Sequence, residues 1–504
     1  MAISNAVGSE RVSRVVGYII TKGNFSNTTP NLPQRIAILG EANAANQGSL
    51  DVTPTEITNS QQAGQLYGYG SPIYTMMRIL RPNSGSGIGG IPTVVYPQAS
   101  SGATAAEREV TPVGTATANG THTLVINGRK SVDGGKYDFT IASGDNPAAI
   151  VAKMITSVNN VLGAPVIATN GTGKIVLTSK WEGLTSEELD VSVDSNGLNL
   201  GVTYGVVSSA TGAGSPSVVS SLNSFGEDWN TVVINPYGAA AFDDLEAFNG
   251  IPDPTSPTGR YTGIIMKPFI ALYGDKTDDP SVLTDSRKIQ VTNAACPAPM
   301  SKGYDMEAAA NMALLFARVA QDTPHLDVNA LTYPDMPIPD NGDIGSMIDY
   351  DFRDSIVKKG SSTVTLNSGR YKIEDFVTTY HPDGENPPQF RYCRNLMLDF
   401  NVRFTYYLLE QINVVDKAIA ADGDVVSVSG VIKPKMWKQI VDNMAADLGK
   451  RALIADVPFM QESIEVGIST INPDRLETFF KYKRTGIARI ASTTAQAGFN
   501  FGTL

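Results

Sequence analysis

One long interruption of an otherwise alternating helix and strand pattern constrains the fold of this chain more than any other feature. Residues 111–215 are rich in Gly, Thr, Ser, Asn and Val, and their hydrophobic residues alternate as in short, half-buried strands. Before them, strands at 34–40 and 93–96 flank a helix that begins at Ser71 and Pro72, which is a βαβ pattern. The same pattern resumes after the interruption. The sequence therefore predicts a β-rich domain inserted into a single sheet.

The predicted fold class is an α/β core with a mixed sheet and flanking helices, an inserted β-rich domain (the insert) and extended, strand-forming N- and C-terminal arms. Gly/Ser-rich stretches bound the insert on both sides and support its separation from the core. In chain order the predicted parts are the N-terminal arm, the first piece of the core, the insert, the second piece of the core, a C-terminal α+β part and the C-terminal arm: residues 1–30, 31–110, 111–215, 216–330, 331–485 and 486–504.

Hydrophobic periodicity and turn residues predict the remaining elements. After the insert we expect strands at 229–235, 263–273 and 288–294, and helices at 242–249 and 305–321. In the C-terminal part, strands 363–366 and 371–376 face each other across the turn sequence NSGR, and helices follow at 395–420 and 435–448. The last expected strands are 463–471, 475–483 and 486–491.

Composition excludes several classes of function. The 50 acidic and 39 basic residues give a net charge of −11, which argues against non-specific nucleic-acid binding. Two cysteines are too few for a disulfide scaffold or a cysteine-rich zinc site. No apolar run reaches the roughly 18 residues of a membrane span, so we expect no direct membrane insertion. The first residues do not resemble a targeting signal, so we expect a soluble protein made in the cytoplasm.

Charge is distributed unevenly along the chain. Residues 1–40 and 474–504 each carry a net charge of +3, which leaves −17 on the residues between them. A chance distribution is the simpler interpretation of so few charges. The alternative is that the two ends are arms that seek acidic surfaces, with copies of the same chain as the obvious candidates.

The residues that usually carry chemistry are scattered. The three histidines do not stand at metal-ligand spacings: His122, His325 and His381. A G-x-G-x-x-G match at Gly85, Gly87 and Gly90 follows a helix and precedes a strand, whereas dinucleotide binding needs the reverse order. The acidic stretch 335–354 lacks the twelve-residue calcium pattern. We therefore expect no catalytic, cofactor or metal site and no enzymatic activity.

A basic stretch around Trp437 stands out in this acidic chain. It contains five cations: Lys433, Lys435, Lys438, Lys450 and Arg451. Such a stretch is usually a solvated helix face. It is also suited to docking against an acidic partner surface.

Four stretches in a fixed order resemble a known family. They are GTATANGTHTLVINGRK with DNPAAIVAKMITSVNN and GKIVLTSKWEG in the insert, then FGEDWNTVVINPYGAAAFDDLEAF, then GRYKIEDFVTTYHPDGENPPQFRYCRNLM, and finally INPDRLETFFKY. Over most of residues 60–490 the chain resembles the tail sheath proteins of contractile-tailed phages, in particular the Mu-type sheath.

The resemblance implies a structural, non-enzymatic subunit without cofactors. Copies would stack as rings around a tail tube and contract on a baseplate trigger, driving the tube through a bacterial envelope. The expected partners are further copies of the chain, the tail tube protein, and the baseplate and tail-terminator proteins, with no nucleic acid. The expected location is the virion, after assembly in the cytoplasm of the host bacterium. The alternative is a virion decoration or host-adhesion protein that binds through the insert.

The resemblance also implies that the extended arms add strands to a sheet on neighbouring copies. Both ends fit this role, because they are short, rich in β-branched residues and basic at their flanks. The expected inter-subunit residues are Val12, Val15, Val16, Tyr18, Ile19, Ile20, Ile487, Arg489 and Ile490. The five cations around Trp437 are the expected tube-facing residues.

Overall fold

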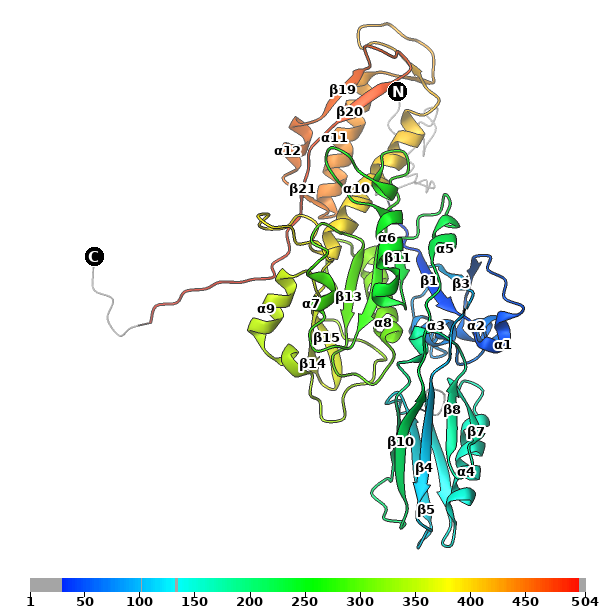
Figure 1. Cartoon of the computed structure of the whole chain (residues 1–504). Coiled ribbons are helices and arrows are strands. Elements are labelled where there is room, and N and C mark those ends of the chain that lie inside the picture. The colour runs from blue at the N-terminus through cyan, green and yellow to red at the C-terminus, as the bar shows by residue number, and fades with distance from the viewer. Residues whose placement is uncertain (1–29, 101, 132–134, 498–504) are drawn as a thin grey trace, which may run out of the picture.

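The computed structural model describes residues 30–100, 102–131 and 135–497. Figure 1 shows an elongated, mixed α/β molecule with the insert at one end, a sheet flanked by helices in the middle, and a helical C-terminal unit at the other end. The last described residues leave the side of the middle part as an extended chain (Figure 1). Among the described helices, none is long and apolar enough to cross a membrane.

The middle of the molecule is built on a six-stranded sheet with the order β13-β12-β11-β1-β3-β2. Five strands are parallel, and the short edge strand β2 is antiparallel. Nearly all residues of the five parallel strands are buried, as in sheets covered on both faces. The strands are β1 (Ile36–Glu41), β2 (Thr55–Glu56), β3 (Thr93–Gln98), β11 (Val232–Ile234), β12 (Ile270–Asp275) and β13 (Asn293–Pro297).

Alternate residues of β1 point into two separate layers, because successive side chains of a strand face opposite ways. Ile36 and Ile38 pack with the helices α3 (Pro72–Leu80) and α8 (Asp305–Asp322). Ala37 and Leu39 pack with the helices on the other face, α5 (Val219–Asn223) and α6 (Phe242–Asn249). A further helix, α2 (Ser60–Tyr67), precedes α3. The predicted βαβ unit is confirmed, since β1 and β3 are parallel and the Ser71 hydroxyl accepts a hydrogen bond from Tyr74 N at 3.1 Å.

The insert lies between β3 and β11 and has its own hydrophobic core. Two sheets, β10-β4-β8-β7 and β6-β5-β9, enclose this core with the helix α4 (Pro147–Asn159). The strands are β4 (Glu107–Val113), β5 (Gly120–Ile126), β6 (Lys136–Ile141), β7 (Val166–Asn170), β8 (Ile175–Ser179), β9 (Val191–Asp194) and β10 (Thr203–Ala210). Because β4 begins at Glu107, the inserted sheet extends four residues before the predicted boundary at 111.

The C-terminal region contains one hairpin against the middle part and a separate helical unit. The predicted hairpin is confirmed as β14 (Thr363–Asn367) and β15 (Arg370–Asp375). The helical unit packs around Trp437 and is formed by α10 (Cys393–Asn413), α11 (Pro434–Lys450) and α12 (Val457–Glu462). Short strand pairs complete it: β16 (Ala418–Ile419) with β17 (Val431–Ile432), β18 (Ile454–Ala455) with β21 (Lys483–Arg484), and β19 (Glu465–Ile468) with β20 (Leu476–Phe479). Two short helices, α7 (Ser281–Thr284) and α9 (Tyr350–Lys358), lie on the middle part, and α1 (Ala44–Gln47) follows β1.

Several predicted element bounds are wrong, each for a local reason. The strand predicted at 263–273 begins only at Ile270, because residues 262–266 form a turn in which Met266 N donates to the Thr262 carbonyl at 2.8 Å. The strand predicted at 288–294 is displaced to β13. The helix predicted at 395–420 ends at Asn413, because residues 414–417 form a turn in which Lys417 N donates to the Val414 carbonyl at 3.1 Å and Asp416 has a φ of +60°. Residues 486–491 are not a strand, because no second strand in the described chain pairs with them.

Candidate assembly surfaces

The first candidate surface is the C-terminal segment, residues 485–497. Its first residues are bound to the rest of the folded chain, which we call the body. The Arg484 guanidinium donates to both Asp399 carboxylate oxygens, at 2.7 and 2.6 Å. The carbonyl of the next residue, Thr485, accepts a hydrogen bond from the Arg394 guanidinium at 2.7 Å. These bonds fix the chain where it leaves β21.

A second attachment follows at Arg489. Its guanidinium pairs with Asp327 and, at 3.5 Å, with Asp375, and its centre lies 3.7 Å from the centroid of the Tyr392 ring. The Arg489 side chain is 13% exposed and that of Asp327 is 1% exposed. Burial raises the pKa of Asp375, and the neighbouring Arg489 acts in the opposite direction. The structure therefore places Arg489 against its own chain.

The described residues beyond Arg489, 490–497, are all exposed. Ile490 is 87% exposed, and residues 485–497 contain neither helix nor strand. Ile487 lies between the two attachments and is exposed. The remaining predicted arm residues lie outside the described residues: Val12, Val15, Val16, Tyr18, Ile19 and Ile20.

The second candidate surface is the hairpin of β19 and β20. These two strands pair only with each other among the described strands, from Glu465 opposite Phe479 to Ile468 opposite Leu476. Each strand therefore presents one edge without a strand partner. Such edges are templates for the addition of another strand.

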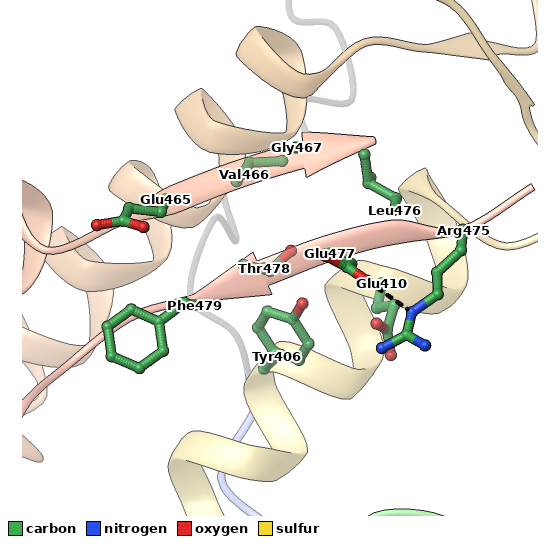
Figure 2. Close-up of a pocket in the computed structure, with 10 residues that line it drawn as sticks. All are labelled: Tyr406, Glu410, Glu465, Val466, Gly467, Arg475, Leu476, Glu477, Thr478 and Phe479. Atoms are coloured by element: carbon green, nitrogen blue, oxygen red, sulfur yellow. Dashed lines mark ion pairs between the residues drawn. The ribbon is translucent and has the colours of Figure 1, made fainter. Parts of the chain in front are cut away.

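A groove of about 680 Å³ lies between this hairpin and α10. Figure 2 shows Tyr406 and Glu410, both from α10, on the β20 side of the hairpin. Three of the lining residues are acidic and one is basic; they are Glu410, Glu465, Glu477 and Arg475. Arg475 is paired with Glu477 at 3.0 Å, so the groove has a net negative charge that suits a basic segment (Figure 2).

The basic stretch around Trp437 does not form one face. Lys435 and Lys450 are exposed, whereas the Lys438 ammonium donates to the Ile464 carbonyl at 2.8 Å. Lys433 precedes α11, and its ammonium donates to the Asp424 carbonyl. Arg451 donates to the Asn31 side chain at 2.7 Å and pairs with Asp447 at 3.2 Å, so it holds the chain's first described residues against α11.

The insert meets the middle part through charged groups that we call the insert joint: Arg129 and Glu188 of the insert, with Lys276, Glu307 and the more exposed Asp335 of the middle part. Arg129 pairs with Glu307, and with Asp335 at 2.6 Å. Lys276 pairs with Glu188 at 3.2 Å. Burial raises the pKa of Glu188, and Lys276 opposes this shift. Sequence reasoning missed this joint, because its partners are up to 206 residues apart.

A second buried carboxyl lies at the same boundary. Glu41, the last residue of β1, is 1% exposed and accepts a hydrogen bond from the Thr185 hydroxyl of the insert at 3.1 Å. Burial raises the pKa of Glu41 to about 8. The side chain approaches Gly183, where an added Cβ would lie 2.9 Å from its Oε1 atom, and Gly183 has a φ of +109°. Glu41 therefore supports the junction as a largely neutral group at pH 7.

The other residues considered from the sequence lie apart. His122 bonds the Tyr204 hydroxyl at 2.7 Å inside the insert, and His381 lies near Asp285, 3.5 Å away. Residues 85–90 form the loop between α3 and β3. Within the described ranges, no group of three or more His, Cys, Asp or Glu side chains could hold a metal ion.

The chain is similar over most of its length to a curated protein. No family model matches the chain. A curated relative, the Mu-like prophage FluMu tail sheath protein of Haemophilus influenzae, is 23% identical over 431 residues, which cover 82% of this chain and 83% of the relative. The predicted resemblance to tail sheath proteins is therefore confirmed.

The chain also matches solved structures over most of its length. One is the sheath tail protein of Desulfitobacterium hafniense, with 12% identity, coverage of 93% of this chain and 99% of that one, and a TM-score of 0.43. Another is a chain of the anti-feeding prophage baseplate, with 11% identity, coverage of 97% and 100%, and a TM-score of 0.46. A third is a chain of the contracted anti-feeding prophage helical sheath, with 10% identity, coverage of 96% and 99%, and a TM-score of 0.43.

Proposed function

We propose that the chain is the structural subunit of a contractile tail sheath. Copies polymerise as stacked rings around a tail tube, and contraction drives the tube through a bacterial envelope. The observation that carries this proposal is the extended C-terminal segment 485–497, for which the described chain provides no strand partner, together with the β19–β20 hairpin, whose two outer edges pair with no other described strand. The similarity to a tail sheath protein over most of both chains supports it.

In this proposal the arms link neighbouring copies by strand addition. The C-terminal arm, or the basic N-terminal arm that includes Val12–Ile20, pairs with a free edge of the β19–β20 hairpin on the next copy. If one arm forms about five backbone hydrogen bonds at about 0.5–1.5 kcal/mol each, the link contributes roughly 3–7 kcal/mol before side-chain burial. The acidic groove beside the hairpin favours a basic arm.

The partners follow from the same proposal. Copies of the chain form the sheath, the tail tube lies inside it, and the baseplate and a tail terminator close its ends. The exposed Lys435 and Lys450 are the members of the basic stretch that remain available to face an acidic tube surface. Assembly takes place in the cytoplasm of the host bacterium, and the mature sheath belongs to the virion.

Negative-stain electron microscopy of the full chain, with sedimentation alongside, tests the proposal. We expect hollow, striated tubes of uniform width from the full chain. Removal of residues 1–22, or of all residues after Thr485, should leave a folded monomer that does not polymerise. Circular dichroism confirms that each truncated chain is folded. Long tubes from either truncated chain would contradict the linkage through arms.

A further inference from the structure

We infer that Arg489 is the anchor of the C-terminal arm: it fixes where the arm leaves the body, and the segment exchanged between copies begins after it. This inference rests on the proposed function, since it concerns the arm that links the copies. It changes the role expected for Arg489 from the sequence, because a side chain bound to its own body is not available to a neighbour.

The geometry of the Arg489 contact is that of a fixed attachment. The guanidinium spans two carboxylates that come from different elements: Asp327 follows α8, and Asp375 ends β15. Its flat face lies over Tyr392, the residue that precedes α10. Three separate parts of the middle region therefore meet at one side chain. A planar cation with several donors can satisfy both acids and stack on the ring at once, which a lysine cannot do.

Burial makes this contact costly to open. The Asp327 carboxylate is almost fully buried, and among the described residues Arg489 is the cation that forms an ion pair with it, while Arg394 acts on it electrostatically without such a pair. If the arm lifted away from the body, an uncompensated carboxylate would remain in a low-dielectric site. An arm that contacted the body only at variable positions would leave no such buried carboxylate behind when it moved away.

The anchor sets where the exchanged part of the arm begins. The described residues that follow it, 490–497, are exposed and contain neither helix nor strand, so the exchanged segment begins there. Tension on the arm is then delivered to the ends of α8, β15 and α10, in the middle of the molecule, and not to the β19–β20 hairpin.

Nitroxide spin labels on the unassembled full chain test the anchor directly. Both native cysteines are buried, so a cysteine placed at the exposed position Ala488 or Thr494 takes the label selectively. We expect the label at 488 to be immobilised and the label at 494 to move as in a free peptide. Arg489→Ala should make the 488 spectrum resemble the 494 spectrum. Equal mobility at 488 and 494 in the chain with Arg489 intact would overturn the inference.

Two further variants complete the test. Asp327→Asn removes the buried carboxylate from the other side of the contact and should loosen residue 488 in the same direction as Arg489→Ala. Arg475→Ala is the matched control, because it removes an arginine from an exposed ion pair, and it should leave the spectrum at 488 unchanged. An Asp327→Asn variant with an unchanged spectrum would contradict the assigned contact.

Assembly provides the second readout, and it separates the inference from the proposed function. With residues 491–504 intact, Arg489→Ala should reduce the number of tubes by about tenfold or more, because an arm without a fixed exit point loses more conformational entropy when a neighbouring copy binds it. Wild-type tube number and width in a variant whose residue 488 has become mobile would overturn the positioning role. If the unsubstituted chain forms no tubes, the proposed function fails, while the spin-label result still decides whether the anchor exists.

Discussion

The insert joint allows a quantitative prediction for Arg129→Ala. The Arg129 side chain is 9% exposed and Glu307 is 4% exposed, so this pair is desolvated. Asp335 is 52% exposed, and its pairing contributes little. Removal of the arginine leaves Glu307 buried beside Tyr304, whose backbone N–H still donates to it at 2.9 Å. The loss of such a partner costs about 3–5 kcal/mol of unfolding free energy.

Urea unfolding of the full chain measures this cost, with limited proteolysis to show that the insert is the part released first. Lys358→Ala is the control, since the pair of Lys358 with Asp354 is exposed and should contribute less than about 1 kcal/mol. The double variant Arg129→Ala with Glu307→Gln removes the buried charge and should recover most of the loss. A loss below about 1 kcal/mol for Arg129→Ala, or no recovery in the double variant, would refute the reasoning.

Three other predictions follow from named groups. In the folded chain the pKa of Glu41 is raised to about 8, so the stability that this protonated side chain contributes is fully present below about pH 4.5. As the pH rises through 8, the free energy of unfolding falls by up to about 5 kcal/mol. Glu41→Gln should remove this pH dependence, and equal slopes of melting temperature against pH in both chains would contradict it. Excision of residues 105–212, which keeps the Thr104–Ala213 pair, should spare tube assembly only when Glu307→Gln accompanies it, as micrographs of both chains would show; tubes from the excised chain without that substitution would contradict this. Lys435→Glu should weaken assembly that depends on a tube at moderate salt, and unchanged pelleting with the tube would exclude Lys435 from that surface.

The elements that local chemistry determines were predictable from the sequence. The βαβ unit followed from buried runs and from the Ser71-Pro72 helix start, and the hairpin of β14 and β15 followed from its turn sequence. The sequence carries no comparable signal for strand β10, because its residues are mostly exposed and its hydrophobic pattern is weak. Residues 486–491 have the composition of a strand, but a strand needs a partner, and composition does not supply one.

The candidate surfaces were less predictable, because they depend on contacts between distant residues. The Arg489 contact joins residues 162 positions apart, and the insert joint joins residues up to 206 positions apart. A single sequence shows that these side chains are charged but not which charges meet. The basic stretch around Trp437 illustrates the same limit, since Arg451 and Lys438 are bound within the chain while Lys435 is exposed.

The chain crosses between the middle part and the insert twice, and the two crossings are paired. Thr104 and Ala213 exchange two backbone hydrogen bonds, at 2.9 and 3.2 Å. To the central sheet, the whole insert is therefore equivalent to one closed loop between β3 and β11. A domain of different size or ancestry could replace it at this point without a change of register in the sheet, provided that the replacement brings a cation to Glu307. The paired crossing is thus a position where one inserted domain can be replaced by another while the central sheet keeps its structure.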